Sequence, residues 1–377
     1  MKVAIIHYWF ITRRGGEKVV ESILKLFPEA DIYTLFYDKE IYGNYIENHE
    51  ITTSILNSKF FKKRYQKIFP LYPIGIKTLK LKKNYDLIIS SESGPAKGIR
   101  IPNNCPHICY IHSPMRYCWG FTQDYLNSMP KLIRPIASFF FKLLRNWDKT
   151  TINNVTYYIA NSYNVKDRVN KYYNRDSAVI HPPIDLKLFE HELVNAKKDV
   201  YLSFGAITPY KRIDLLVDTF NQNGKKLIII GDGSEKNKLQ LKAKKNIQFL
   251  GVLKWEEIET VFTRTRALIF PGEEDFGMIP LEIMAYGIPV LAFKKGGALE
   301  TVIVDEKSTA KSTGLFFEFQ NTESIQKCID EFEIVEKKFD PNWIKNHARN
   351  FNENIFLEKF KLFLKEKLNL PNVLQTR

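Results

Sequence analysis

The chain has 377 residues, of which 44% are apolar and 26% are charged. This balance excludes a disordered chain, a collagen and a disulfide-stapled miniprotein, and at about 150 residues per domain the length predicts two domains. The net charge is +14 and uneven, because residues 1–190 carry 28 Lys and Arg against 16 Asp and Glu, which leaves +12 in that half and +2 in the remainder.

The first half alternates predicted strands and helices, beginning with a strand in KVAIIHYW. Its apolar run is short and no small-residue cleavage site follows, so no signal peptide is predicted. A loop with Gly15 and Gly16 and a helix at 17–27 come next, and the polar stretch 186–199 is expected to be a linker. Further strands are predicted at 31–37, 85–91, 107–113, 156–162 and 177–183.

The second half repeats this alternation. Strands are predicted at 200–206, 225–233, 247–251, 267–271, 289–293 and 313–317, and helices at 211–222, 235–244, 255–265, 280–287 and 297–303. The strands are continuous apolar runs, as expected for parallel sheets that are covered on both faces. The sequence therefore predicts two doubly wound α/β domains, with ligands beyond the carboxyl ends of the strands and between the halves.

A third segment follows these two domains, since an amphipathic helical stretch is predicted from about 342 to 368. The expected boundaries are 1–190 for an N-terminal domain, 191–345 for a C-terminal domain and 346–377 for a helix and tail that return towards the first domain. No apolar run reaches the roughly 20 residues of a membrane span. The four cysteines are expected to be reduced thiols of a cytosolic protein.

A basic segment lies between Glu50 and Asp86, where nine Lys or Arg occur without an acid. Aromatic residues separate these charges, which suits an anionic membrane surface. The predicted membrane contact is Lys59, Lys62, Lys63, Arg64 and Lys67, with Phe139, Phe140 and Phe141 as a second element. The alternative is that the aromatics pack into the core and the lysines are only solvated. Nucleic acid is not expected, because no known binding pattern accompanies the charge.

The densest candidate site is FPGEEDFGMIPLEIMAYG at 270–287. Glu274 belongs to a loop after a strand, and Pro280 suits the first helical turn, which would also hold Glu282. Backbone N–H groups of such a loop and helix start can bind an anion. A carboxylate beside that anion can accept hydrogen bonds from the hydroxyls of a sugar or ribose. The alternative for Glu282 is a purely structural interaction with the helix dipole.

Three further positions are candidates for the same kind of ligand. Lys211 lies at the start of a helix after a strand, where a cation can meet a diphosphate. Gly15 and Gly16 allow the backbone to approach a phosphate or a sugar closely, although an ordinary turn is the alternative. His112 follows a strand end and is expected in a cleft. No C-x2-C pair, D-x-D pair, G-x-S-x-G elbow or Walker A sequence occurs, so no metal site is predicted.

Taken together, these residues resemble the family 4 glycosyltransferases, which are retaining enzymes of the two-domain GT-B fold. The resemblance covers roughly residues 1–345 and rests on EDFGMIPLEIMAYGIPV, which is similar to the E-x7-E motif of that family. GGEKVVESILKLFPEADIYTL, ICYIHSPMRYCW and IANSYNVKDRVNKYY resemble the bacterial branch that builds O-antigen, capsule and exopolysaccharide chains, often from mannosyl-type donors. The resemblance implies that the C-terminal half binds a nucleoside diphosphate sugar and the N-terminal half presents the acceptor.

The resemblance also assigns roles to individual residues. It places Glu282 on the ribose and Glu274 on the sugar, with Phe276 and Gly277 of the same motif on the donor side. It places Lys211 at the diphosphate, Gly15 and Gly16 at the phosphate and acceptor side, and His112 by the transferred sugar. The family's usual Arg before the lysine is replaced by Ala206, and the residues that could compensate are Arg13, Arg14 and Arg212.

The function that follows is a retaining, metal-independent hexosyltransferase without a cofactor. It would act on a glycan or polyprenyl-linked acceptor at the inner face of the cell membrane, in surface polysaccharide biosynthesis. Two alternatives remain open on the sequence alone. One is a sugar-nucleotide epimerase on the same fold, and the other is an inactive binding subunit, suggested by Ala206.

Overall fold

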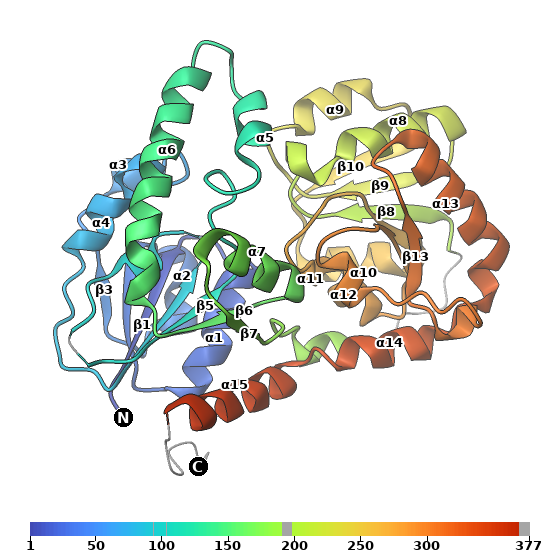
Figure 1. Cartoon of the computed structure of the whole chain (residues 1–377). Coiled ribbons are helices and arrows are strands. Elements are labelled where there is room, and N and C mark those ends of the chain that lie inside the picture. The colour runs from blue at the N-terminus through green and yellow to red at the C-terminus, as the bar shows by residue number, and fades with distance from the viewer. Residues whose placement is uncertain (93, 103, 191–197, 369–377) are drawn as a thin grey trace. The chain divides into compact units, whose positions relative to one another are not determined.

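The computed structural model describes residues 1–92, 94–102, 104–190 and 198–368, which divide into two units. Unit 1 comprises residues 1–183 together with the C-terminal segment from Asn354, and unit 2 comprises Ile184–Glu353. Each unit is built around one fully parallel sheet with helices on its faces (Figure 1). The predicted class of two doubly wound α/β units is therefore confirmed.

The sheet of unit 1 has the strand order β3-β2-β1-β4-β5-β6-β7. Its central strand β1 pairs on both sides, so that Ile5 is opposite Ile32 on β2 and Ile89 on β4. The strands are β1 (Val3–Phe10), β2 (Asp31–Tyr37), β3 (Ile51–Thr53), β4 (Leu87–Glu92), β5 (His107–Ile111), β6 (Tyr157–Ala160) and β7 (Ser177–Val179). Since the order reverses between β1 and β4, the loops after these strands flank the usual ligand position of such folds.

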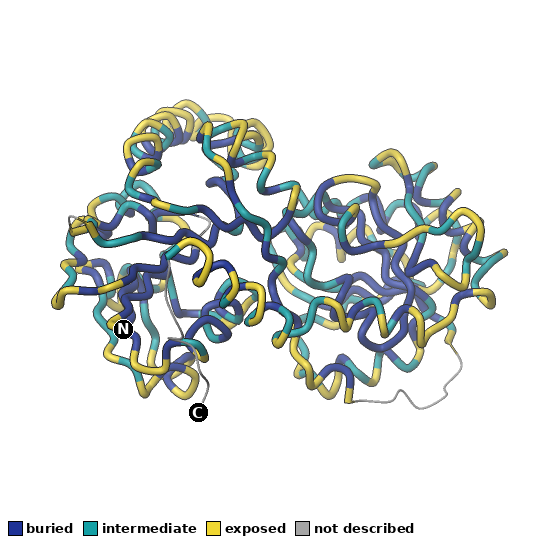
Figure 2. The backbone as a smooth tube through the Cα atoms, turned by 60° about the horizontal axis from the view of Figure 1, so that its bottom comes forward, coloured by how far each residue is buried: buried dark blue, intermediate teal, exposed yellow. Residues whose placement is uncertain are grey.

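Helices cover both faces of this sheet, which is why its central strands are largely buried, whereas the edge strand β3 is partly exposed (Figure 2). One face packs on α1, α2 and α15 and the other on α4, α6 and α7. The helices are α1 (Gly15–Leu26), α2 (Lys39–Ile46), α3 (Lys59–Lys62), α4 (Tyr72–Thr78), α5 (Thr122–Asn127), α6 (Arg134–Thr151), α7 (Tyr163–Tyr173) and α15 (Glu353–Leu368). Phe356, Phe360, Phe363 and Leu364 of α15 enter the same core as α1.

The six-stranded sheet of unit 2 has the order β10-β9-β8-β11-β12-β13 and reverses between β8 and β11. Its strands are β8 (Val200–Phe204), β9 (Leu227–Ile230), β10 (Ile247–Gly251), β11 (Thr265–Phe270), β12 (Val290–Phe293) and β13 (Gly314–Phe317). Its helices are α8 (Ile213–Asn223), α9 (Lys236–Lys242), α10 (Trp255–Arg264), α11 (Met278–Met284), α12 (Ala298–Thr301), α13 (Thr322–Val335) and α14 (Pro341–Arg349).

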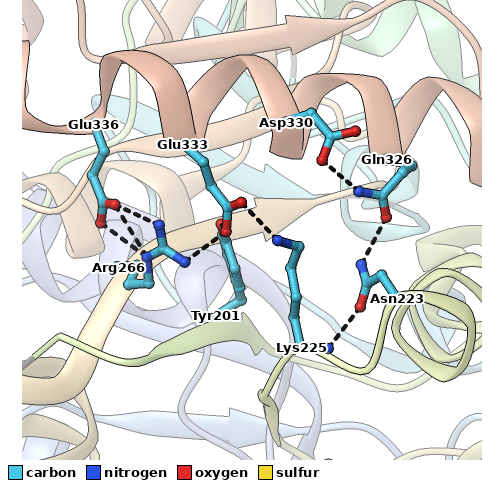
Figure 3. A network of polar contacts seen from close by, with 8 residues as sticks. All are labelled: Tyr201, Asn223, Lys225, Arg266, Gln326, Asp330, Glu333 and Glu336. Carbon is cyan, nitrogen blue, oxygen red and sulfur yellow. Dashed lines mark hydrogen bonds and ion pairs between the residues drawn. The ribbon is translucent and has the colours of Figure 1, made fainter.

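A polar network fixes α13 to the end of this sheet opposite the ligand loops (Figure 3). The guanidinium of Arg266, near the start of β11, donates to Glu333 at 2.7 Å and to Glu336 at 3.0 Å. Tyr201 and Lys225 donate to the same Glu333 carboxylate at 2.9 and 2.6 Å. The network is half-buried, so it determines where the helix sits more than it adds to stability.

The sequence did not predict α13, α2 to α7 or the short edge strand β3, and it joined two helices into one. The tail is α14 and α15, which are separated at Asn350–Asn352. The predicted linker at 186–199 begins instead with a 3₁₀ turn at Leu186–Phe189, in which Leu188 and Phe189 are buried. Residues 191–197 lie outside the described part of the chain.

A buried ion pair lies in unit 1 between Lys97, in the turn after β4, and Asp148 on α6. Both side chains are fully buried, and the second oxygen of Asp148 accepts from Trp119 Nε1 and from the Tyr173 hydroxyl, each at 2.8 Å. The ion pair thus connects the β4 turn, α6, α7 and the loop that follows β5. Both carboxylate oxygens of Asp148 therefore have partners. Removing one partner would leave a buried polar or charged group unpaired.

Replacing Lys97 by Met should lower the free energy of unfolding by about 3–5 kcal/mol, because it leaves the buried carboxylate of Asp148 without its cation. Lys97→Met combined with Asp148→Asn should recover part of this loss, since the amide oxygen still accepts from Trp119 and Tyr173. Urea denaturation measures both. Lys82→Met, which breaks the exposed ion pair with Glu50, is the matched control and should change stability little. Equal losses in free energy of unfolding for Lys97→Met and Lys82→Met would contradict a stabilising role of the buried ion pair.

Candidate functional site

The candidate donor site of unit 2 consists of the loops at the carboxyl ends of β8, β9, β11 and β12, which pack backbone against backbone. A side chain at Gly231 would overlap the carbonyl oxygen of Gly205, and its φ of +136° is one that other residues avoid. A side chain at Gly297 would likewise overlap Phe276. The Gly231 turn therefore serves close loop packing.

Lys211 and Glu274, which the sequence assigned to one ligand, form an ion pair in unit 2. The lysine comes from the turn Pro209–Lys211 after β8 and the glutamate from the loop after β11. Their side chains are 14% and 15% exposed, so the pair is largely removed from solvent without being closed off. The Glu274 carbonyl accepts from Gly297 N–H at 2.9 Å, which fixes the backbone of this loop.

Two details of the predicted donor motif differ in the structure. Helix α11 begins at Met278 rather than at Pro280, so Glu282 is its fifth residue and lies in the second turn, not the first. Its side chain is only 8% exposed. Phe276 is buried and packs on Phe351 with ring centroids 5.9 Å apart, so any contact that this residue makes with a ligand is left to its backbone. Gly277 caps α11 with a φ of +85°.

The loop after β8 has Ala206 at the position where the sequence resemblance implies an arginine. Ala206 is exposed, so the position is open towards solvent. Arg212, one of the residues suggested as a substitute cation, donates to both oxygens of Asp214 at 3.1 and 3.0 Å. Its charge is therefore already partnered within unit 2, and Lys211 is the cation that the structure places against the motif.

In unit 1 the structure brings His112 and Gly16 together. A side chain at Gly16 would lie 3.6 Å from His112 Nε2 and 3.6 Å from the Tyr8 hydroxyl, which is ordinary contact and not a clash. Gly16 thus lines a polar surface, and packing within unit 1 does not require a glycine at this position. His112 Nε2 is 2.9 Å from the Ser91 hydroxyl at the end of β4, which holds the ring in place.

His7, which the sequence did not select, lies beneath this surface. Its Nδ1–H donates to the Ser91 carbonyl at 2.9 Å, so the deprotonated nitrogen is Nε2, which has no hydrogen-bond partner in the described part of the chain. Burial, with the nearby His112 as a second cause, lowers the pKa of His7 to about 3. The ring is therefore neutral at every physiological pH and can only accept at Nε2. The sequence signal that could have identified His7 was its position on the first strand, whose following loop contains Gly15 and Gly16.

Glu17 is a second residue that the sequence reasoning missed. It lies in the first turn of α1, is 1% exposed, and accepts from Trp9 Nε1 at 3.1 Å and from Arg14 N–H at 3.2 Å. Burial, the largest cause, raises the pKa of its carboxyl to about 7 although these hydrogen bonds oppose the shift. A carboxyl that titrates near neutrality beside a ligand loop is typical of functional sites.

The other predicted cations of this loop differ in their surroundings. Arg13 donates to both oxygens of Glu21 at 2.9 and 2.8 Å and lies over the Tyr45 ring at 4.4 Å, so its charge is used within unit 1. Arg14 is exposed and begins α1 as its N-cap.

The basic segment at 59–67 is exposed at Lys59, Lys63, Arg64 and Lys67, whereas Lys62 is half-buried and paired with Asp38 at 3.1 Å. Its aromatics behave differently from the charges. Phe61, Tyr65 and Phe69 pack against the core and Tyr72 is buried in it, so among the five aromatics Phe60 alone is exposed, at 61%. Within the described residues, no helix has both the length and the apolar character needed to cross a bilayer.

Two family models match consecutive parts of the chain. Residues 13–188 match the family model described as Glycosyltransferase Family 4, and residues 185–351 match the model described as Glycosyl transferases group 1. An uncharacterised glycosyltransferase of Methanocaldococcus jannaschii is 26% identical over 95% of both chains. The O-antigen chain mannosyltransferase RfbU of Salmonella typhimurium is 25% identical over 57% of this chain and 64% of its own. The alpha-1,3/1,6-mannosyltransferase ALG2 of Saccharomyces cerevisiae is 26% identical over 94% of this chain and 80% of its own.

Solved structures of the same architecture include Anabaena Alr3699/HepE in complex with UDP, with a TM-score of 0.68 and 16% identity over 97% of this chain and all of that one. Sucrose-phosphate synthase of Thermosynechococcus elongatus has a TM-score of 0.69 and 16% identity over 98% of this chain and 99% of its own. At these identities the likeness establishes the fold, and the predicted GT-B class is confirmed.

The raised pKa of Glu17 predicts a pH-dependent stability. The folded chain holds this proton more tightly than the unfolded chain, whose glutamate pKa is about 4.3. Stability is therefore lost as the pH rises from about 4 to about 7, and the loss is complete above pH 7. Glu17→Gln should remove this loss and should exceed the wild type in free energy of unfolding at pH 8, by up to about 3 kcal/mol.

Urea denaturation at pH 5 and at pH 8 measures this difference. Glu29→Gln, at an exposed glutamate beyond the end of α1, is the control and should follow the wild type at both pH values. A Glu17→Gln effect of the same size at pH 5 and pH 8 would mean that the carboxyl titrates normally.

Proposed function

Since the chain belongs to the family 4 glycosyltransferases of the GT-B fold, we propose that it transfers a hexose from a nucleoside diphosphate sugar to a glycan acceptor with retention of anomeric configuration. The single observation that carries this proposal is the Lys211–Glu274 pair at the carboxyl ends of β8 and β11. It combines, in one place, a cation suited to a diphosphate and a carboxylate suited to sugar hydroxyls. The complexes of the Anabaena relative with UDP and with UDP-glucose support this class of donor.

The pair suggests how the donor site is prepared. In the unliganded site Glu274 neutralises Lys211, so neither charge is left without a partner in a largely buried place. An arriving diphosphate replaces the carboxylate at Lys211, which releases Glu274 for the hydroxyls of the sugar. Cleavage of the anomeric bond then builds negative charge on the diphosphate, and a fixed cation there stabilises it, by roughly 3–4 kcal/mol for one such group. No metal and no cofactor has a part in this scheme.

The acceptor is proposed to approach unit 1 at the Gly15–Gly16 loop, where His112 contributes a ring nitrogen held by Ser91. The mannosyltransferase relatives favour a mannosyl-type donor, and the O-antigen chain named for one of them supports a role in surface polysaccharide biosynthesis. For the acceptor we propose a lipid-linked glycan. A lipid-linked acceptor requires the enzyme to work at the membrane, which we propose to be the inner face of the cell membrane. The exposed Lys59, Lys63, Arg64 and Lys67 suit its anionic headgroups.

Turnover tests the proposal against its two alternatives. The protein is incubated with UDP- and GDP-sugars, with and without a polyprenyl-linked glycan, in the presence of EDTA. Nucleotide release that depends on the acceptor, with an α-linked product from an α-linked donor, is the expected result. Conversion of the free sugar nucleotide to an epimer without acceptor would instead indicate an epimerase. Nucleotide binding without any turnover would indicate an inactive binding subunit.

The two motif glutamates should separate in calorimetric titrations with UDP and GDP. Glu282→Ala should weaken binding of the free nucleotide diphosphate about 10- to 100-fold, because a carboxylate that holds two ribose hydroxyls is lost. Glu274→Ala should leave this affinity unchanged or tighten it, since Lys211 loses its internal partner, while kcat falls about tenfold or more.

Glu273→Ala is the matched control, because Glu273 is the neighbouring residue but pairs with the exposed Lys295 at 3.0 Å. It should change neither quantity by more than about twofold. Equal weakening of nucleotide binding in the Glu274 and Glu282 variants would contradict the proposed division between sugar and ribose.

A further inference from the structure

Helix α6 presents a line of exposed apolar side chains along its first ten residues and the turn before it. Leu132 and Ile133, just before the helix, are 91% and 50% exposed, and Ile136, Phe139 and Leu143 are 60%, 59% and 47% exposed. Positions 132, 136, 139 and 143 are spaced by four, three and four residues, which places them on one side of a helix. The buried residues Ala137, Phe141 and Leu144 occupy the opposite side and hold α6 on unit 1.

Positive charge lies beside this apolar line. Lys142 and Lys149 are exposed and seven residues apart, so they form a second line next to the first, and Lys131 precedes the helix on the same side. Between Asp124 and Asp167 the sequence has a single acid, Asp148. That acid is fully buried in its pair with Lys97, so it does not offset the lysines at the surface.

We propose that this side of α6 docks on an anionic bilayer, with the apolar line in the acyl boundary and the lysines among the headgroups. The combination of a long apolar line and basic flanks without an exposed acid is that of an interfacial helix. A protein partner would need acidic groups aligned with an apolar groove, whereas an anionic bilayer supplies both features along the whole apolar line at 132–143.

The burial of the other candidate aromatics supports this choice. Because Phe61, Tyr65, Phe69 and Tyr72 pack inward, the basic segment at 59–67 can attract a membrane but has little to insert into it. Phe69 contacts Phe141 on the inner side of α6 with ring centroids 5.5 Å apart, so the two elements are neighbours on unit 1 (Figure 1). The segment thus adds charge next to the helix that carries the apolar surface.

Docking through α6 also connects to the site, a consequence that rests on the proposed function. Arg145 Nε donates to the Cys118 carbonyl at 2.6 Å, and Asp148 accepts from Trp119. Both contacts hold the loop that follows His112. A membrane-bound α6 therefore keeps this loop, and the acceptor surface beside it, at the membrane from which a lipid-linked acceptor comes.

Co-sedimentation with vesicles tests the proposal, using phosphatidylcholine alone and phosphatidylcholine with phosphatidylglycerol. The wild type should bind the anionic vesicles and be partly released by salt. Ile136→Ser/Phe139→Ser should lower the partition coefficient about tenfold or more, and what binding remains should be removed by salt. Lys131→Glu/Lys142→Glu should weaken binding to anionic vesicles only.

Leu241→Ser/Ile334→Ser is the matched control, because these side chains of unit 2 are 91% and 79% exposed and should not affect vesicle binding. The proposal is overturned if the Ile136/Phe139 variant binds like the wild type, or if it changes only the oligomeric state in sedimentation velocity. Titration of UDP and GDP into the same variants keeps the two proposals apart. Loss of vesicle binding with intact nucleotide binding concerns α6, and absent nucleotide binding in the wild type concerns the proposed function.

Discussion

The structure depends on one constraint, that parallel strands deliver all their following loops to the same edge of the sheet. In unit 2 four such loops must share that edge, and they can do so only where backbone lies directly against backbone. The turn at Gly231 against Gly205, and Gly297 against Phe276, meet this requirement. The positions of Lys211 and Glu274 follow from it, because each is carried by one of these packed loops.

Charges at the two candidate sites are handled in opposite ways. In unit 2 a lysine and a glutamate neutralise each other as an ion pair. In unit 1 burial disfavours the charged forms of two groups, because it lowers the pKa of His7 to about 3 and raises that of Glu17 to about 7. The candidate site of unit 2 thus keeps its two charges as an ion pair, whereas that of unit 1 shifts the pKa values of its buried groups towards the neutral forms.

The sequence predicted the strands of both sheets except the short edge strand β3, because parallel strands are apolar runs with clear ends. It predicted the turns of the candidate donor motif because glycine and proline mark them. The sequence reasoning did not identify α6, although the residues of this helix are amphipathic. His7 and Glu17 were missed for a physical reason. Their shifted pKa values result from burial beneath the loop. Only the folded chain shows which side of a strand or helix is buried.

Helix α6 carries two surfaces that must keep a fixed angle to each other. One surface is the apolar line with Ile136 and Phe139. The other is formed by Arg145, which donates to the Cys118 carbonyl, and Asp148, which accepts from Trp119. One residue inserted between these groups would rotate one surface against the other by about 100°, whereas seven would restore the angle almost fully. Evolution can therefore lengthen or shorten this helix only in steps close to two turns, however freely its individual side chains change.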